Sequence, residues 1–274
     1  MKLATFNVNS IKMRAGIVRD WLETHRPDIL ALQELKGTDF PEPDFKSLGY
    51  TSHVVAQKAY NGVAILTRDE TVTVDSQPPV LTRLPGMEDD DQARCVVLRI
   101  VAPIAMTVIN VYVPNGNPVG TDKYAYKLRW LKALCDDMGA RRARGENVVV
   151  MGDYNIIPED ADSARPEDWR GDALAQPEVR AMYRAMVYAG YIDTLKTYGA
   201  GAGDGRPTDQ GNYTFWDYQA GAWQRNNGIR IDHILVTPGL ADRVQRVWVD
   251  RTPRGAEKPS DHTPVGIEIA TEGI

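Results

Sequence analysis

"VVVMGDYNIIPED", from Val148 to Asp160, starts as a continuous apolar run and then turns abruptly polar. Such a run predicts a buried strand. It ends in Gly152-Asp153-Tyr154-Asn155, where a carboxylate and a carboxamide are two residues apart. Because side chains alternate along a strand, we expect Asp153 and Asn155 on one face and Tyr154 on the other. Taken alone, this ending fits an ordinary turn as well as it fits a functional site.

The segments around this stretch predict a mixture of helices and short strands. No shift in composition and no linker divides the chain, so we expect one domain over residues 1–274. The expected fold is α/β, with sheets packed face to face and helices outside. Strands are predicted at 2–8, 28–34, 51–57, 62–67, 94–100, 106–113, 147–151, 229–236, 243–249 and 264–269, and helices at 11–25, 121–138 and 177–188.

The composition excludes several classes of protein. With 43% hydrophobic and 25% charged residues, the chain is typical of a soluble globular protein. Its net charge of −5 argues against non-specific binding to polyanions, although a local basic face remains compatible with it. No apolar segment is long enough for a signal peptide or a membrane span. Cys95 and Cys135 lack metal-ligand spacing, and we expect them to be reduced, as in a cytoplasmic protein.

Polar side chains end or interrupt five further predicted strands. Each one alone is explained as a turn former or a rim residue. Asp232 is harder to explain in this way, because an ionised carboxylate within an apolar strand is costly unless it is paired. We expect His262 to be its partner, kept cationic by the carboxylate, whereas His233 should face the opposite side. The polar set is Asn7, Asn9, Gln33, Glu34, Tyr112, Asn115, Asp232, Asp261 and His262.

Together these residues indicate chemistry with a hard cation. Carboxylates and carboxamides without clustered cysteine or histidine suit Mg²⁺ or Mn²⁺. A His–Asp pair beside such a metal suits cleavage of a phosphate ester, while another carboxylate handles the water. A serine hydrolase is less attractive, because the sequence has no Gly-x-Ser-x-Gly elbow. A Walker loop and a Gly-x-Gly-x-x-Gly motif are also missing from the sequence.

Nine motifs occur in the order found in bacterial exonuclease III-type apurinic/apyrimidinic (AP) endonucleases, and the chain resembles this family from about residue 2 to residue 269. The family belongs to the endonuclease/exonuclease/phosphatase superfamily. The resemblance implies a four-layer α/β sandwich of two mostly antiparallel sheets, with the site where strand ends of both halves meet. The motifs are "ATFNVNSI", "LALQELK", "YNGVAIL", "INVYVPNG", "YKLRWL", "VVMGDYNI", "YTFWDYQ", "NNGIRIDHILV" and "SDHTPVGIEI".

The resemblance also implies a metal site. Glu34 resembles the main metal ligand, helped by Asn7 and, from the other side of the site, by Asp261. The ion expected in this family is Mg²⁺, with Mn²⁺ as a substitute. The residues expected near the metal are Asn7, Glu34, Asp153, Asn155, Asp261 and His262.

Catalytic roles follow from the same resemblance. Asp153 resembles the residue that positions or deprotonates the attacking water, and Asn155 the neighbour that holds the water or the phosphate. His262, oriented by Asp232, resembles the donor to the non-bridging phosphate oxygens. Tyr112 resembles a phosphate-contacting group that also assists the leaving oxygen.

Substrate contacts are implied on two sides of this group. Asn115 resembles a further phosphate contact. Four residues, Phe215, Trp216, Ile229 and Ile231, correspond to the apolar pocket for an extruded abasic sugar. Candidate contacts to the DNA backbone, each equally well explained as solvated surface, are Lys58, Lys123, Lys127, Arg225 and Arg254. The segments 162–169 and 199–211 follow no family pattern, and the glycine-rich second one is expected to be a surface loop.

The expected activity is that of a Mg²⁺-dependent exodeoxyribonuclease III / AP endonuclease in DNA repair. It would hydrolyse the phosphodiester 5′ to abasic sites in duplex DNA and also act as a 3′–5′ exonuclease that trims 3′ ends. The alternative is a superfamily phosphatase or phosphodiesterase for a small phosphoester or lipid head group. The aromatic and basic segment 213–235 favours the nuclease. We expect a monomer without membrane contact, in the cytoplasm of a bacterium with its nucleoid DNA.

Overall fold

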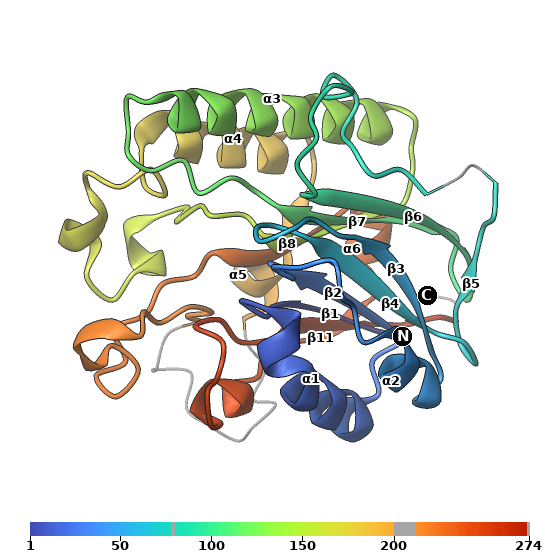
Figure 1. The fold of residues 1–274 in the computed structure, drawn as a ribbon. Coiled ribbons are helices and arrows are strands. Elements are labelled where there is room, and N and C mark those ends of the chain that lie inside the picture. Colours follow the sequence, from blue (N-terminus) through green and yellow to red (C-terminus); the bar gives the residue numbers. More distant parts are fainter. Residues whose placement is uncertain (78–79, 200–211, 273–274) are drawn as a thin grey trace.

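The computed structural model describes residues 1–77, 80–199 and 212–272. Two six-stranded sheets pack face to face. Helices α3 and α4 cover the outer side of one sheet, and α1 and α2 cover that of the other (Figure 1). This arrangement confirms the predicted four-layer sandwich. The glycine-rich loop predicted at 199–211 lies, apart from Gly199, outside the described residues.

The first sheet has the strand order β11-β12-β1-β2-β4-β3. Its only parallel pair in the described chain is β1 with β2, and its other pairs are antiparallel. The strands are β1 (Lys2–Asn7), β2 (Ile29–Gln33), β3 (Tyr50–Val55), β4 (Val63–Arg68), β11 (Val244–Val249) and β12 (Val265–Ile269).

The second sheet has the order β5-β6-β7-β8-β10-β9. Here β7 and β8 are parallel, and the other described pairs are antiparallel. The prediction of mostly antiparallel sheets is therefore confirmed. The strands are β5 (Thr73–Val74), β6 (Cys95–Ala102), β7 (Met106–Tyr112), β8 (Val148–Asp153), β9 (Ile192–Asp193) and β10 (Asp232–Val236).

The helices follow from apolar stripes that face the sheets. In α1 the buried side chains are Ile11, Val18, Trp21 and Leu22, which recur at helical spacing. No helix in the described part of the chain is long and apolar enough to cross a membrane. The α-helices are α1 (Ile11–His25), α2 (Glu42–Ser47), α3 (Asp122–Ala143), α4 (Pro177–Tyr188), α5 (Thr194–Tyr198) and α6 (Pro238–Ala241).

The central core lies between the two sheets, and outer cores lie under the helices. The central core joins side chains of both sheets, among them Ile65 of β4 and Val149 of β8. Strand β8 is buried along its whole length, as the run of valines predicts. At its end Gly152 has φ 148°, and a Cβ there would lie 1.9 Å from the carbonyl oxygen of Val111. Only glycine therefore lets β8 run this close to β7 up to Asp153.

One predicted strand is shorter than expected. The sequence predicts a strand over 229–236, but β10 begins at Asp232. Residues before it pair only through isolated bridges, which join Ile229 to Ser163 and to Phe215. This part of the chain therefore leaves the sheet and crosses the end of the sandwich, where it supports the loops that surround the site.

Candidate active site

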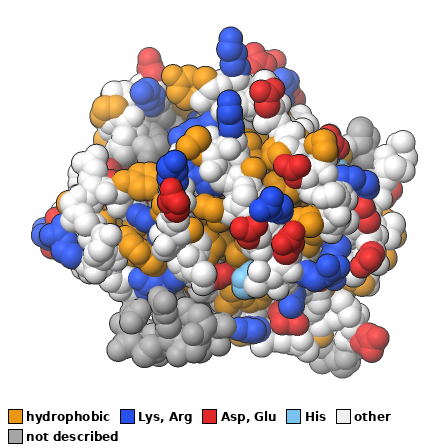
Figure 2. Space-filling view, turned by 60° about the horizontal axis from the view of Figure 1, so that its bottom comes forward, with side chains coloured by type: hydrophobic (Ala, Val, Ile, Leu, Met, Phe, Trp, Pro, Cys, Tyr) orange, Lys and Arg blue, Asp and Glu red, His pale blue; other side chains and the backbone are white. Residues whose placement is uncertain are grey.

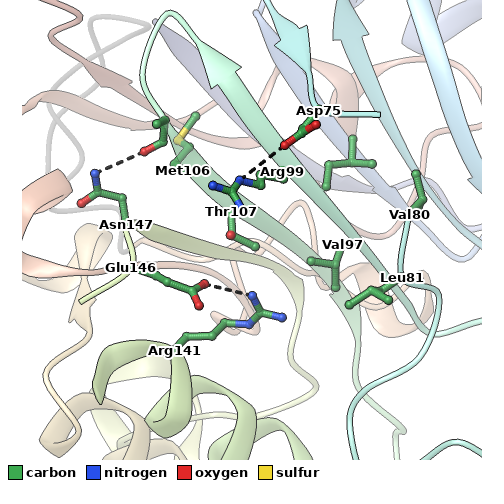
Figure 3. A pocket seen from close by; sticks show the side chains of 12 residues that line it. Asp75, Val80, Leu81, Val97, Arg99, Met106, Thr107, Arg141, Glu146 and Asn147 are labelled. Atoms are coloured by element: carbon green, nitrogen blue, oxygen red, sulfur yellow. Dashed lines mark hydrogen bonds and ion pairs between the residues drawn. The ribbon is translucent and has the colours of Figure 1, made fainter. Parts of the chain in front are cut away.

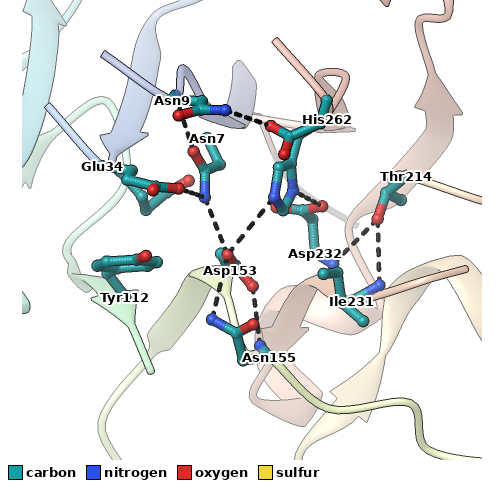
Figure 4. Close-up of polar contacts among 12 residues, drawn as sticks. Asn7, Asn9, Glu34, Tyr112, Asp153, Asn155, Thr214, Ile231, Asp232 and His262 are labelled. Carbon is teal, nitrogen blue, oxygen red and sulfur yellow. Dashed lines mark hydrogen bonds and ion pairs between the residues drawn. The ribbon is translucent and has the colours of Figure 1, made fainter. Parts of the chain in front are cut away.

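The ends of strands from both sheets meet at one end of the sandwich. In the second sheet the register places Asp153 directly opposite Asp232 of β10 on one side and beside Tyr112 of β7 on the other. In the first sheet Asn7 ends β1, and Glu34 follows β2 directly. These side chains face one another across the gap between the sheets (Figure 4).

Asp153 is the centre of this group. Its Oδ2 accepts a hydrogen bond from Nδ2 of Asn7 at 2.9 Å, which joins the two sheets. Its Oδ1 accepts the backbone N–H of Asn155 at 2.8 Å, and Nδ2 of Asn155 lies 3.4 Å from Oδ2. Tyr154 points away and is fully buried, with its hydroxyl donating to Val150 O. The predicted alternation of faces at this strand end is confirmed.

Asp232 and His262 form the predicted pair. Nδ1 of His262 lies 2.8 Å from Oδ2 of Asp232, and Nε2 lies 3.7 Å from Oδ2 of Asp153. All three side chains are buried. His233 lies on the other side of β10, where its ring packs against Tyr154. The structure thus brings together the histidine and carboxylate that the sequence placed 30 residues apart.

The protonation of this group follows from burial and charge. Burial alone would lower the pKa of His262, but Asp232 and Asp153 outweigh it and raise the pKa to about 10. His262 is therefore an imidazolium at neutral pH. Burial raises the pKa of Asp153 to about 7, although the positive charge of His262 opposes this. A carboxylate with a pKa near neutrality is well matched to accept a proton from water.

The residues fit a hard cation. Donor atoms of Asp153, Asp232 and His262 lie within 4.8 Å of one another. Oδ1 of Asp232 is buried and has no hydrogen-bond partner among the described residues. Two buried carboxylates therefore face a single imidazolium, which leaves negative charge and oxygen donors for a cation.

Glu34 joins this group through Asn7. Nδ2 of Asn7 donates to Oε2 of Glu34 at 3.0 Å as well as to Asp153. The other oxygen of Glu34 lies 2.9 Å from Nζ of Lys36. Asp261 is held by Nδ2 of Asn9 at 3.0 Å. His262 was assigned both a metal role and a donor role from the sequence; as an imidazolium it has no free lone pair, which favours the donor role.

Tyr112 lines the opposite wall. Burial and the negative charges of Glu34 and Asp153 raise its pKa well above the usual value, so the phenol stays neutral and can donate. Arg94 lies over its ring, with Cζ 5.0 Å from the ring centre. Sequence reasoning missed Arg94, although the register of β6 and β7, in which Cys95 lies opposite Val111, gives its place.

Asn115 and Asn155 are connected, and a buried lysine holds both. Nδ2 of Asn115 donates to Oδ1 of Asn155 at 3.3 Å. Nζ of Lys127 donates to the carbonyl oxygens of Asn115 and Asn155, at 3.0 and 2.6 Å. Lys127 is fully buried, so its assignment as a contact to the DNA backbone is wrong. It lies three residues after Tyr124 and four before Leu131, on the buried side of α3.

The four residues assigned to the sugar pocket do not have the same exposure. The ring of Phe215 is half-buried, and its centre lies 5.0 Å from that of His262. Ile229 lines a hollow together with Phe215. Ile231 and Trp216 are buried, and Trp216 packs edge-on against Trp223. The structure therefore places Phe215 and Ile229 where a ligand reaches them, and Trp216 behind them.

The remaining basic candidates divide in the same way. Lys58, Lys123 and Arg225 are exposed. Arg254 is buried and donates to the carbonyl oxygen of Trp216 at 3.0 Å, so its assignment to the DNA backbone is wrong. On the face of the molecule in Figure 2, basic and acidic side chains are interspersed around hydrophobic patches. That face shows no continuous basic surface.

Two further residues support the site without having been predicted. Oγ1 of Thr214 accepts the backbone N–H groups of Ile231 and Asp232, both at 3.1 Å, and fixes the start of β10. Buried Arg230 donates to Asp162 and Asp193 from the other side of the same segment. The motif "YTFW" carries Thr214, but nothing in the sequence shows which backbone it binds.

A separate hollow of about 370 Å³ contains none of these residues (Figure 3). Met106, the first residue of β7, and Asn147, just before β8, line it. It therefore lies at the opposite end of these strands from Tyr112 and Asp153. The guanidinium group of Arg141 in this hollow is paired with Glu146 at 3.1 Å. We assign this hollow no role.

Comparison with known proteins agrees with the geometry of the site. The model of the Endonuclease/Exonuclease/phosphatase family matches residues 4–262. The chain belongs to this family. Among its curated relatives in the family is exodeoxyribonuclease III of Haemophilus influenzae, which is 31% identical over 280 residues and covers 98% of this chain and 100% of that protein.

Solved structures of the family match over nearly the whole chain. A variant of the 3′ phosphatase NExo from Neisseria, bound to a product DNA hairpin, is 35% identical, with a TM-score of 0.87 over 98% of this chain and 99% of that one. An AP endonuclease from Archaeoglobus fulgidus is also 35% identical, with a TM-score of 0.85 and the same coverage. The resemblance inferred from the nine motifs is confirmed.

Proposed function

We propose that this chain is a Mg²⁺-dependent DNA repair nuclease that hydrolyses the phosphodiester 5′ to an abasic site in duplex DNA. The same site would act as a 3′–5′ exonuclease and trim 3′ ends. The observation that carries the proposal is the convergence on Asp153 of an amide from the first sheet and the His262–Asp232 pair. The named activities of the relatives, exodeoxyribonuclease III, 3′ phosphatase and AP endonuclease, support it.

Asp153 is assigned to the attacking water. With its pKa raised to about 7 by burial, the carboxylate can take a proton from water as the oxygen attacks phosphorus. The bond from phosphorus to the 3′ oxygen of the preceding nucleotide then breaks. That oxygen gains a proton and leaves as a 3′-hydroxyl, and the phosphate stays on the 5′ side of the abasic sugar.

His262 and Tyr112 are assigned to the phosphate. The imidazolium of His262 donates from Nε2 towards the non-bridging oxygens, because Nδ1 is engaged by Asp232 at 2.8 Å. The neutral phenol of Tyr112 is placed to donate to the phosphate and to assist the leaving oxygen. Asn115 and Asn155 present their amides beside the same position. Preorganised donors of this kind stabilise charge that develops in the transition state.

Mg²⁺ is the proposed cofactor, with Mn²⁺ as a substitute. Glu34, Asn7 and Asp261 would hold the ion, with Asp153 and Asn155 nearby. When bound, it supplies positive charge beside the reacting phosphate and promotes ionisation of water. The excess of buried carboxylate over imidazolium in the site supports this cofactor.

The abasic sugar is assigned to the wall formed by Phe215 and Ile229. Phe215 packs against His262, so a sugar against its ring would lie beside the reacting phosphate. Ile231 and Trp216 support this wall from behind. Lys58, Lys123 and Arg225 are the exposed cations assigned to the DNA backbone. The core shared by both sheets supports the proposal that residues 1–274 act as one catalytic domain.

A panel of labelled substrates tests this function. Duplex oligonucleotides carry one internal tetrahydrofuran site, a 3′-phosphate or no lesion, and p-nitrophenyl phosphate and an inositol phosphate represent small phosphoesters. With Mg²⁺, we expect incision 5′ to the tetrahydrofuran and removal of the 3′-phosphate. Turnover of the small phosphoesters alone would contradict the proposal and favour the phosphatase alternative.

A further inference from the structure

A hollow of about 340 Å³ lies beside the active site. Phe215 lines it, and the ring of Phe215 also packs against His262, with 5.0 Å between the ring centres. The hollow therefore continues the wall that we assign to the abasic sugar. Its volume falls within the range of about 300–1,000 Å³ that is usual for sites of drug-sized ligands. It is larger than one base-free deoxyribose needs.

Trp169 gives this hollow a second aromatic wall. It ends the short 3-10 helix Pro166–Trp169 and packs with Phe215 against a small apolar cluster that includes Ile229. Trp169 is only half-buried, so part of its ring is available to a ligand. Aromatic side chains of this kind stack on nucleobases irrespective of sequence.

The segment that carries Trp169 is fastened to the site. Asp162 accepts a hydrogen bond from Nε of buried Arg230 at 2.7 Å, and its carbonyl oxygen accepts the backbone N–H of Arg230. The backbone N–H of Ala164 donates to Gly228 O at 3.0 Å. These contacts hold segment 162–169 against the strand residues that precede Asp232. Trp169 is therefore placed by the same element that places the catalytic pair.

The charge of the hollow indicates which part of a nucleotide it accepts. Asp168, Asp172 and Asp217 line it, and among the described residues no lysine or arginine does. A phosphate would be repelled there, whereas an uncharged ring is not. Carboxylates can also accept hydrogen bonds from the exocyclic amino groups of bases.

We propose that this hollow receives the nucleobase of a 3′-terminal nucleotide, with the base stacked on Trp169. The proposal rests on the nuclease function proposed above and assigns Trp169 as a specificity-determining residue for base-bearing 3′ ends. The chemistry is the same: water adds to phosphorus, and the bond to the 3′ oxygen of the penultimate nucleotide breaks. The terminal nucleotide leaves as a 5′-monophosphate, and the new end carries a 3′-hydroxyl.

Three substrates that differ only beyond the reacting phosphate test this assignment. One duplex carries a 3′-phosphate, which leaves the hollow empty. A second carries an internal tetrahydrofuran, which places a sugar without a base. The third has an undamaged recessed 3′ end, which places a sugar and a base. Single-turnover rates are measured for wild type, Trp169→Ala, Trp169→Phe and Glu167→Gln, the last being an exposed control in the same 3-10 helix.

We expect Trp169→Ala to slow removal of the base-bearing nucleotide by about ten- to a hundredfold, the loss typical of one stacking contact. Removal of the 3′-phosphate should stay within about twofold of wild type. Trp169→Phe should recover much of the loss, and Glu167→Gln should behave as wild type. The unchanged 3′-phosphate rate separates this effect from misfolding.

An equal loss on all three substrates, or no loss on the base-bearing end, would overturn the assignment of Trp169. A wild-type enzyme that acts on the first two substrates and not on the third would overturn it as well. If wild type acts on none of the three, the proposed nuclease function itself fails. These outcomes separate the failure of the inference from the failure of the function.

Discussion

At the scale of single residues, Lys127 shows how the site depends on groups that never touch substrate. Burial lowers its pKa to about 7, with Asp153 and Asp172 acting in the opposite direction. Its ammonium group donates to the carbonyl oxygens of Asn115 and Asn155, so it holds together two loops that we assign to the phosphate. A shift of either loop by about 1 Å would disturb the geometry of the reaction.

Lys127→Met should therefore lower kcat by roughly ten- to a hundredfold, because both amides lose their support. KM for an abasic duplex should change much less, since Lys127 is buried away from the DNA. The kinetic constants of this variant are compared with those of Lys132→Met, an exposed lysine of the same helix. A rise in KM without loss of kcat would instead point to a direct contact with DNA.

The burial of Lys127 was predictable in part from the sequence. Its spacing from Tyr124 and Leu131 places it on the buried side of α3, but a lysine at such a position more often reaches solvent with its charged end. The two carbonyl acceptors that allow it to stay inside belong to loops distant in sequence. Periodicity gives the face of a helix, and only the folded structure gives the partner.

At the scale of elements, the second sheet depends on the close approach of β7 and β8. Gly152→Ala should destabilise the protein by about 2–3 kcal/mol, because its Cβ would meet the carbonyl oxygen of Val111. Gly139→Ala in α3 is the matched control: its Cβ would meet nothing within 4 Å, and alanine favours a helix. Urea denaturation of both variants checks this. Equal stability of the two would contradict the packing described for β8.

Helix α1 is tied to β11 through Asp250. Nε1 of Trp21 donates to Oδ2 of Asp250 at 2.8 Å, and Nε2 of His25 lies 3.1 Å from the same oxygen. Burial alone would raise the pKa of Asp250, but hydrogen bonds from His25, Thr252 and Trp21 outweigh it and lower the pKa to about 2. A carboxyl group with a lowered pKa stabilises the fold above its unfolded pKa, and this contribution is lost as the pH falls.

Asp250→Asn should thus cost about 1–2 kcal/mol of unfolding free energy near pH 7. The difference from wild type should narrow as the pH falls from about 4 towards about 2, where the wild-type carboxylate becomes protonated. Urea denaturation at a series of pH values measures it. A difference that is constant over this range would show that the charge of Asp250 does not contribute.

The sequence predicted the elements better than the contacts between them. Strand ends and helical stripes gave most elements and the polar groups at the site, because alternation and helical spacing are local properties. The start of β10 was missed, since isolated bridges to Ser163 and Phe215 replace sheet pairing there. Gln33 was grouped with the site residues, yet its Nε2 donates to Asn110 between the sheets at 2.7 Å. That contact depends on how the two sheets pack.

At the scale of the whole molecule, the site exists only because two sheets place opposite charges at one end of the sandwich. Removal of metal with EDTA should abolish incision, and added Mg²⁺ should restore it. Mg²⁺ should also raise the melting temperature, because an ion bound to the folded state stabilises it by mass action. Glu34→Gln should weaken this thermal shift, whereas Glu23→Gln on the exposed side of α1 should keep it. An undiminished shift in Glu34→Gln would remove Glu34 from the metal site.

The central claim is that both sheets converge on Asp153 to activate water against a phosphodiester. The most direct test is the single-turnover incision of a tetrahydrofuran duplex by Asp153→Asn beside Tyr154→Phe. The account predicts a loss of at least about a thousandfold for Asp153→Asn. It predicts a rate near that of wild type for Tyr154→Phe, whose hydroxyl only bonds Val150 O in the core. Undiminished incision by Asp153→Asn, or loss of incision in a folded Tyr154→Phe, would contradict it.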